Sequence, residues 1–156
     1  MAGTRATAAL TQAGVSFAEH SYAVQSAASS YGERAAVALG VDPRRIFKTL
    51  LVATDGTLVV AVVPVAGQLS LKALAATVGG KRAEMAEPAA AERATGYVVG
   101  GISPLGQRRR LPTVVDASAA DHPTIYVSGG RRGLQVELDP ADLIALTDAR
   151  VAALTR

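Results

Sequence analysis

The sequence predicts a single α+β domain over residues 1–156, with a curved, mixed but mostly antiparallel, barrel-like sheet and short helices packed outside it. Three observations support this prediction. The chain has 156 residues, a length that fits one domain. Segments with strand character dominate its middle, and short helical segments lie around them. No strand–helix–strand rhythm is sustained for long enough to build a doubly wound parallel sheet.

The first half of the chain contains two short helices and then a strong pair of strands. Cap and turn residues divide its beginning into a helix, an extended segment, a loop and a second helix, at residues 4–13, 15–22, 26–32 and 33–39. Residues 46–53 and 57–63 are rich in apolar residues, and the Asp55-Gly56 pair between them is typical of a tight turn. These two segments are therefore expected to form a hairpin.

The second half alternates capped helices with short strands. Ser70 and Pro88 suit the first turns of two helices, which are expected at residues 71–78 and 89–94. Residues 97–101 are predicted as a strand that runs into a glycine turn, and three more strands are predicted at residues 112–116, 124–128 and 134–138. Asp139 followed by Pro140 predicts the start of a last helix.

The composition excludes several common designs of enzyme site. The chain has no cysteine, which removes a disulfide framework, a cysteine-bound metal and a thiol nucleophile of the enzyme. Its two histidines, His20 and His122, cannot form a usual zinc site without carboxylate ligands. The apolar segments, such as residues 58–66, are shorter than the roughly 20 residues that cross a bilayer. We expect a cytoplasmic protein without a membrane partner.

The charge is modest in size but clustered. The formal net charge is +3, and basic residues occur in four short runs, at residues 44–45, 81–82, 108–110 and 131–132. Such runs can bind phosphate groups, and together they could form a nucleic-acid surface. Solvated loop charges are the alternative explanation for each run.

Lys48 is the most unusual residue of the predicted strands. It lies in the middle of a segment that is apolar on both faces, which is typical of a strand buried on both sides. An unpaired ammonium group is costly in such surroundings. Lys48 therefore lies either at an exposed sheet edge or inside a substrate pocket.

Two glycine-rich stretches, residues 96–106 and 126–133, allow close approach of the backbone to a ligand. Neither is a Walker loop or a dinucleotide-binding fingerprint. Tight turns between strands explain both equally well, and the second could also hold a phosphate group beside Arg131 and Arg132.

The order and spacing of these segments resemble the YbaK/EbsC family of aminoacyl-tRNA deacylases, and most of all the bacterial YbaK proteins. The resemblance runs through nearly the whole chain and is densest in four segments, at residues 47–50, 81–86, 96–107 and 124–134. It implies a barrel-like α+β editing domain that hydrolyses mischarged Cys-tRNA(Pro). It also implies that no metal or organic cofactor takes part.

The resemblance further implies which residues form the site. Lys48 matches the key lysine of the family, and Gly101 matches a backbone group that orients the α-amino group, so these two are the expected catalytic residues. Substrate-binding positions are expected at Tyr22, Thr49, Gly100, Ile102, Ser128, Gly129 and Asp139. In the mechanism proposed for the family, the thiol of the substrate attacks its own ester, so that the enzyme supplies proximity and electrostatic stabilisation.

Alternatives stay open at this point. The chain could hydrolyse Ala-tRNA(Pro) with water as the nucleophile, or it could be a non-catalytic module that binds tRNA or a synthetase. The expected partners are the acceptor end of aminoacylated tRNA(Pro) and prolyl-tRNA synthetase. The sequence leaves the oligomeric state open.

Overall fold

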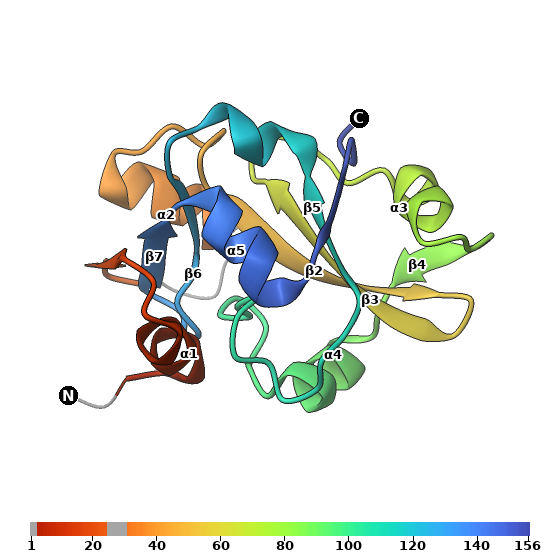
Figure 1. The fold of residues 1–156 in the computed structure, drawn as a ribbon, viewed down its shortest axis with the longest axis horizontal. Helices are drawn as coiled ribbons and strands as arrows, with labels where there is room; N and C mark the ends of the chain where they lie inside the picture. Colours follow the sequence, from red (N-terminus) through yellow and green to blue (C-terminus); the bar gives the residue numbers. More distant parts are fainter. Residues whose placement is uncertain (1–2, 25–30) are drawn as a thin grey trace.

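The computed structural model describes residues 3–24 and 31–156, which form helices and strands in the arrangement shown in Figure 1. In chain order the elements are α1 (Arg5–Ala13), β1 (Phe17–Ser21), α2 (Tyr31–Leu39), β2 (Phe47–Thr54), β3 (Thr57–Pro64), α3 (Leu71–Thr77), β4 (Ala83–Met85), α4 (Pro88–Thr95), β5 (Thr113–Asp116), the 3-10 helix η1 (Ala117–Asp121), β6 (Ile125–Ser128), β7 (Leu134–Leu138), α5 (Pro140–Thr147) and β8 (Arg150–Ala152).

The strands form two sheets that share one bridge. The first has the order β1-β7-β6 and is antiparallel; the second has the order β4-β2-β3-β5-β8 and is mixed, since β5 runs parallel to both β3 and β8. A parallel bridge between Ile46 and Tyr126 joins the sheets at one end of β2. The α+β fold with a mostly antiparallel, mixed sheet is thus confirmed, and among the described residues the strands do not close into a barrel.

The caps predicted at Ser70 and Asp139 lie where their helices begin, and Thr4, predicted as the first residue of a helix, is the cap of that helix. Thr4, Ser70 and Asp139 are the N-caps of α1, α3 and α5, and each accepts a hydrogen bond from a backbone N–H of the first turn. Gly14 ends α1 in the left-handed conformation, with φ of 72°. The hairpin is also confirmed, because β2 and β3 pair from Phe47–Pro64 to Thr54–Thr57.

Of the strand and glycine turn predicted at residues 97–101, the strand is wrong and the turn is confirmed. Gly96 and Gly100 both have a positive φ, of 82° and 92°, and the Gly101 N–H donates to the Val98 carbonyl, so this segment turns instead of extending. Tyr97 is buried and donates a hydrogen bond to the Leu105 carbonyl, which holds the loop against the core.

Two short strands were not predicted, and one predicted loop extends beyond the described residues. β4 and β8 have three residues each and are largely exposed, so no apolar alternation marks them in the sequence. Of the loop predicted at residues 26–32, positions 26–30 lie outside the described residues, and the two that follow already belong to α2.

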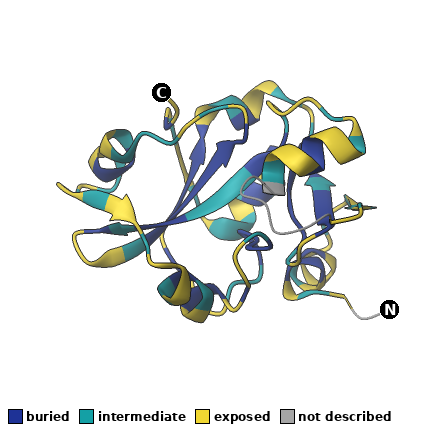
Figure 2. Cartoon of the chain, turned by 180° about the vertical axis from the view of Figure 1, so that it is seen from behind, coloured by how far each residue is buried: buried dark blue, intermediate teal, exposed yellow. Residues whose placement is uncertain are grey.

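The main core lies between the two sheets and is closed by helices. Apolar side chains of β2 and β3 meet those of β6 and β7, and Leu10 of α1, Ala91 of α4 and Leu143 of α5 complete the cluster. In Figure 2 the strands are mostly buried, whereas the helices expose their outer faces. No helix among the described residues is long and apolar enough to cross a membrane.

Candidate functional site

A cavity lies beside the start of β2, next to the point where the two sheets meet. The sheets meet at the Ile46–Tyr126 bridge, and beyond it the strand continues next to β3. On its other side β2 pairs with β4 only at Val52–Thr54, so residues 47–50 face this cavity without a described strand partner there. An unpaired strand edge therefore exposes side chains of both faces to the same space.

The cavity has a volume of about 310 Å³ and is mainly apolar, as binding sites for small molecules usually are. β2, the loop after α4 and the ends of β6 and β7 provide most of its walls. Its lining residues are Gly32, Ile46, Phe47, Lys48, Thr49, Leu50, Leu51, Met85, Ala86, Pro88, Ala91, Val99, Gly100, Ile102, Ser128 and Gln135.

Among the described residues that form this lining, Lys48 is the one that carries a charge. Its side chain is half-buried, and no hydrogen bond or ion pair joins it to another described residue. The hydrophobic walls lower the local dielectric, which strengthens the attraction between an ammonium group and any negative charge that enters. The cavity is thus prepared for a ligand that is anionic or becomes anionic during a reaction.

Two polar side chains in the lining also lack partners among the described residues. The hydroxyl of Thr49 and the Oε1 atom of Gln135 are buried and make no hydrogen bond. Gln135 as a whole is 6% exposed. An unsatisfied buried polar atom costs about 1–3 kcal/mol, so such atoms inside a cavity indicate a ligand that can pair with them. Ser128, opposite Gln135 on β6, instead accepts a hydrogen bond from the Gly130 N–H at 3.1 Å.

Comparison with known proteins agrees with this chemistry. The family model for an aminoacyl-tRNA editing domain matches residues 25–146. The chain belongs to the aminoacyl-tRNA editing family. The resemblance to the YbaK/EbsC deacylases and the expectation of an editing enzyme are thereby confirmed.

Individual relatives cover most of the editing domain. EbsC of Enterococcus faecalis, described as a candidate Cys-tRNA(Pro)/Cys-tRNA(Cys) deacylase, is 41% identical over 79% of this chain and 76% of its own length. A solved structure described as a candidate trans-editing enzyme for prolyl-tRNA synthetase has 27% identity and a TM-score of 0.83, covering 97% of this chain and 95% of that one. The structure of a hypothetical protein gives a TM-score of 0.84 at 25% identity, over 97% and 99% of the two chains.

The editing domain brings five of the expected site residues together at the cavity, which are Lys48, Thr49, Gly100, Ile102 and Ser128. Gly101 lies between two lining residues but packs away from the cavity, since a methyl group in its place would lie 2.8 Å from the Arg131 Cα atom. Gly129 is also behind the wall, where its carbonyl accepts a hydrogen bond from the Thr4 hydroxyl.

Tyr22 and Asp139 are not among the lining residues of the cavity. Tyr22 packs, partly buried, against the cluster that contains Ile46, Val65 and Tyr126. Asp139 is exposed and accepts a hydrogen bond from the Ala141 N–H at 2.9 Å as the N-cap of α5. The local role of Asp139 as a helix cap accounts for its contacts.

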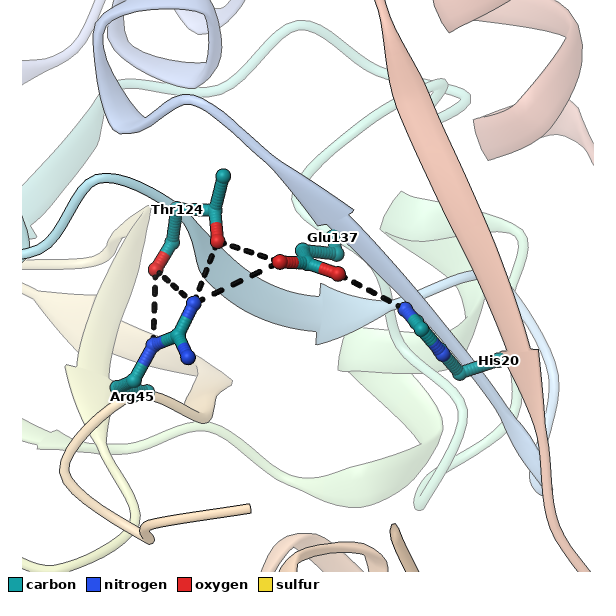
Figure 3. Close-up of polar contacts among 4 residues, drawn as sticks. All are labelled: His20, Arg45, Thr124 and Glu137. Atoms are coloured by element: carbon teal, nitrogen blue, oxygen red, sulfur yellow. Dashed lines mark hydrogen bonds and ion pairs between the residues drawn. The ribbon is translucent and has the colours of Figure 1, made fainter.

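A polar cluster adjoins the site on the first sheet, with every member paired (Figure 3). Glu137 accepts hydrogen bonds from the Thr124 hydroxyl at 2.5 Å and pairs with His20 at 3.0 Å and Arg45 at 3.5 Å. Arg45 also donates to the Thr124 carbonyl and lies over the ring of Tyr126. The hydrogen bond from Thr124, followed by that from His20, lowers the pKa of Glu137 against the effect of burial.

Gln135 is the polar residue of the described lining that the sequence analysis did not identify. The pattern of residues 134–138 does contain the signal, because Leu134, Val136 and Leu138 alternate with Gln135 and Glu137. A buried strand with two polar residues on one face indicates that this face meets something other than core. Within the described part of the chain, no group of three or more His, Asp or Glu side chains could hold a metal ion.

Proposed function

We propose that this chain is a cytoplasmic trans-editing enzyme that deacylates mischarged Cys-tRNA(Pro), with the aminoacylated 3′ end of the tRNA in the Lys48 cavity. Membership of the editing family supports the reaction class, and the similarity to EbsC and to the trans-editing enzyme for prolyl-tRNA synthetase supports this substrate. Under this proposal prolyl-tRNA synthetase is the partner that helps to select tRNA(Pro).

The composition of the cavity lining carries the mechanistic part of the proposal. Apart from Lys48, the lining formed by the described residues contains no titratable side chain, so these residues offer neither a carboxylate nor a histidine as general base. The chain also has no cysteine. Hydroxyl groups are present at Thr49 and Ser128, but a hydroxyl needs an adjacent base to act as a nucleophile. A nucleophile carried by the substrate fits such a site best.

In the proposed reaction the cysteinyl thiol attacks its own ester carbonyl. A bond forms between sulfur and carbon, the bond from carbon to the ribose oxygen breaks, and the thiol proton passes to that oxygen. The products are free tRNA and a cyclic thiolactone, which water then opens to cysteine. The enzyme contributes the folded conformation of the substrate and stabilises the developing oxyanion.

Three polar residues of the cavity and the adjoining Gly101 have proposed roles in this reaction. Lys48 stabilises negative charge on the ester oxygen or on the terminal adenosine phosphate, since it is the cation of the lining. Thr49 and Gln135 hydrogen-bond to the aminoacyl group, because both have polar atoms without described partners. The Gly101 backbone orients the α-amino group, held in place by its contact with the turn at Arg131.

Hydrolysis of Ala-tRNA(Pro) by water is the second candidate, and a module that binds without catalysis is the third. Attack by water would gain from a general base, and the described residues of the lining include no carboxylate or histidine. A purely structural module would gain nothing from the half-buried Lys48 beside unsatisfied polar atoms.

The test is deacylation of Cys-, Ala- and Ser-tRNA(Pro) by the full chain, with and without prolyl-tRNA synthetase. We expect the cysteinyl substrate to react fastest, the serine analogue to react slowly because its hydroxyl is a poorer nucleophile, and a thiolactone to be trapped by an added amine. Adding the synthetase should raise discrimination between tRNA(Pro) and tRNA(Cys). Faster release of alanine than of cysteine would contradict the proposal.

A further inference from the structure

The four basic runs of the sequence have different surroundings in the structure. Arg44 is paired with Asp42 at 2.6 Å, and Arg45 is bound to Thr124 and Glu137. These two charges are thus neutralised within the protein. Residues 81–82 lie beside the β2–β3 turn, where their backbone N–H groups bind the Asp55 carboxylate. The remaining two runs are at a different place in the fold.

Arginines from three separate segments meet around the loop of residues 96–108. A methyl group on Gly96 would lie 2.6 Å from the Arg5 Nη1 atom and 3.5 Å from the Arg108 Cβ atom, so both side chains pass this glycine. Burial raises the pKa of Tyr97 to about 12, and the charge of Arg5 acts against this, which again places Arg5 beside the loop. The backbone of Arg131 touches Gly101 of the same loop.

This arrangement is fixed by close backbone contacts. Gly106 approaches the Arg5 carbonyl so closely that a methyl group there would lie 2.5 Å away. Gly130 similarly approaches Thr4, whose hydroxyl donates to the Gly129 carbonyl. The start of α1, the loop and the β6–β7 turn are therefore held together before any ligand binds.

The charges of this group are not balanced by carboxylates. Arg5, Arg108 and Arg131 are exposed, and none of them forms an ion pair with a described residue. The carboxylate of Glu92, an acidic residue close to the loop, accepts a hydrogen bond from the Val99 N–H. Like charges held close together repel one another, so a rigid cationic group is better explained by a polyanionic ligand than by stability.

The cationic group is continuous with the cavity. Val99 lines the cavity, and its carbonyl accepts a hydrogen bond from Arg132 at 2.9 Å. Gly100 and Ile102 also line the cavity, while Gly101 between them contacts the Arg131 backbone. One loop thus has the cavity on one side and the arginines on the other.

We propose that Arg5, Arg108, Arg131 and Arg132 form an arginine ridge that binds the phosphodiester backbone of an RNA strand whose 3′ end enters the Lys48 cavity. This inference rests on the proposed function, since it supplies the path by which the substrate of that cavity arrives. Backbone contacts carry no sequence information, so the ridge contributes affinity for RNA in general. Selection of tRNA(Pro) would then need another element, such as the synthetase.

The test uses the full chain with alanine at Arg5, Arg108 and Arg131, and a second variant with Arg108→Ala and Arg131→Ala alone, which keeps the packing of Arg5 on Gly96. The matched control is Lys72→Ala, Lys81→Ala and Arg82→Ala, which removes three exposed charges around α3 and β4, at the other end of the molecule from α1 (Figure 1). Binding of an acceptor-stem RNA hairpin that ends in CCA and carries no amino acid is measured as a function of salt concentration. Deacylation of Cys-tRNA(Pro) and of 3′-cysteinyl-adenosine is measured with the same variants.

The triple ridge variant should bind the hairpin on the order of tenfold to a hundredfold more weakly, with a salt dependence that is smaller by about two to three counterions. Its KM for Cys-tRNA(Pro) should rise while deacylation of 3′-cysteinyl-adenosine is unchanged, and the control should resemble the wild type. Unchanged hairpin binding in both ridge variants would overturn the ridge. So would loss of stimulation by the synthetase with RNA binding intact, which would assign the arginines to a protein surface. If the wild type deacylates neither substrate, the proposed function itself fails.

Discussion

Two polar residues on the same face of β7 illustrate how the site differs from its surroundings. Gln135 and Glu137 are two positions apart, so their side chains point to the same side of the sheet. Glu137 is bound by Thr124, His20 and Arg45 (Figure 3), whereas the Oε1 atom of Gln135 is buried beside the cavity without a described partner. The two residues therefore share a face of β7 but differ in whether the protein pairs their polar atoms.

The difference concerns which groups the protein pairs internally. The cluster of Glu137, Thr124, His20 and Arg45 satisfies its own hydrogen bonds and ties the segment before β2 to the first sheet, so it stabilises the fold. The cavity leaves Lys48, Thr49 and Gln135 unpaired among the described residues, which costs stability and is useful only when a ligand binds. Substitutions in the two regions should thus change different measurements.

The largest expected effect is on activity, at Lys48. Replacing it by methionine removes the one charge of the cavity lining while keeping a similar side-chain length. We expect kcat/KM for Cys-tRNA(Pro) to fall on the order of a hundredfold, as when an oxyanion-stabilising donor is lost. The free energy of unfolding should be unchanged or higher, because an unpaired ammonium is removed. Lys72→Met on the exposed side of α3 is the control, and near-normal turnover by Lys48→Met would refute the assigned role.

Gln135→Leu tests the second unpaired group. Loss of one hydrogen bond to the aminoacyl end should lower kcat/KM by about tenfold. Chemical denaturation should show equal or greater stability, since leucine fills similar space without an unsatisfied amide. The matched control is the exposed Gln68→Leu. A large loss of stability with normal activity would place Gln135 among the structural residues instead.

Thr124→Val should have the opposite effect, because its hydroxyl donates to Glu137 and accepts from Arg45. We expect the free energy of unfolding to fall by about 1–2 kcal/mol, while kcat/KM stays within about twofold of the wild type. Thr57→Val, at an exposed start of β3, controls for the change of residue type. Reduced catalysis without reduced stability would mean that the cluster belongs to the site.

The smallest expected effect is the pH dependence that Glu137 contributes. Its partners lower its pKa below the ordinary value of a glutamate, so its stabilising effect is present above that ordinary value and is lost as pH falls through the lowered pKa. The stability difference between wild type and Glu137→Gln should accordingly be constant near neutral pH and shrink in acid. Denaturation curves between pH 7 and pH 3 measure it, and a difference that grows in acid would contradict this account.

Local patterns predicted much of the fold. The caps at Ser70 and Asp139 and the β2–β3 hairpin depend on neighbours in sequence, and these predictions are confirmed. The segment at Tyr97 has the composition of a strand, yet the hydrogen bond of its hydroxyl to the Leu105 carbonyl and the positive φ of its glycines make it a loop. Tertiary contacts overrode propensity there.

The site was less accessible to sequence reasoning. Lys48 is identifiable as a charge within an apolar strand, but the cavity arises from the Ile46–Tyr126 bridge between sheets that are distant in sequence. Gln135 and Asp139 occupy equivalent positions in the alternation of apolar and polar residues. Gln135 nevertheless lines the cavity, whereas Asp139 lies outside it and caps α5. Periodicity predicts which face of a strand a side chain occupies, but it does not predict which residues of other elements pack against that face.

The central claim is that the unpaired polar groups of the Lys48 cavity, and not the paired cluster around Glu137, bind the aminoacyl end of the substrate. The most direct test is a crystal structure of the full chain with the non-hydrolysable amide analogue of 3′-cysteinyl-adenosine. The account predicts the cysteinyl group in the cavity, within hydrogen-bond distance of the Gln135 amide and close to Lys48. An analogue bound at His20 and Glu137, or bound elsewhere with the Lys48 cavity empty, would contradict it.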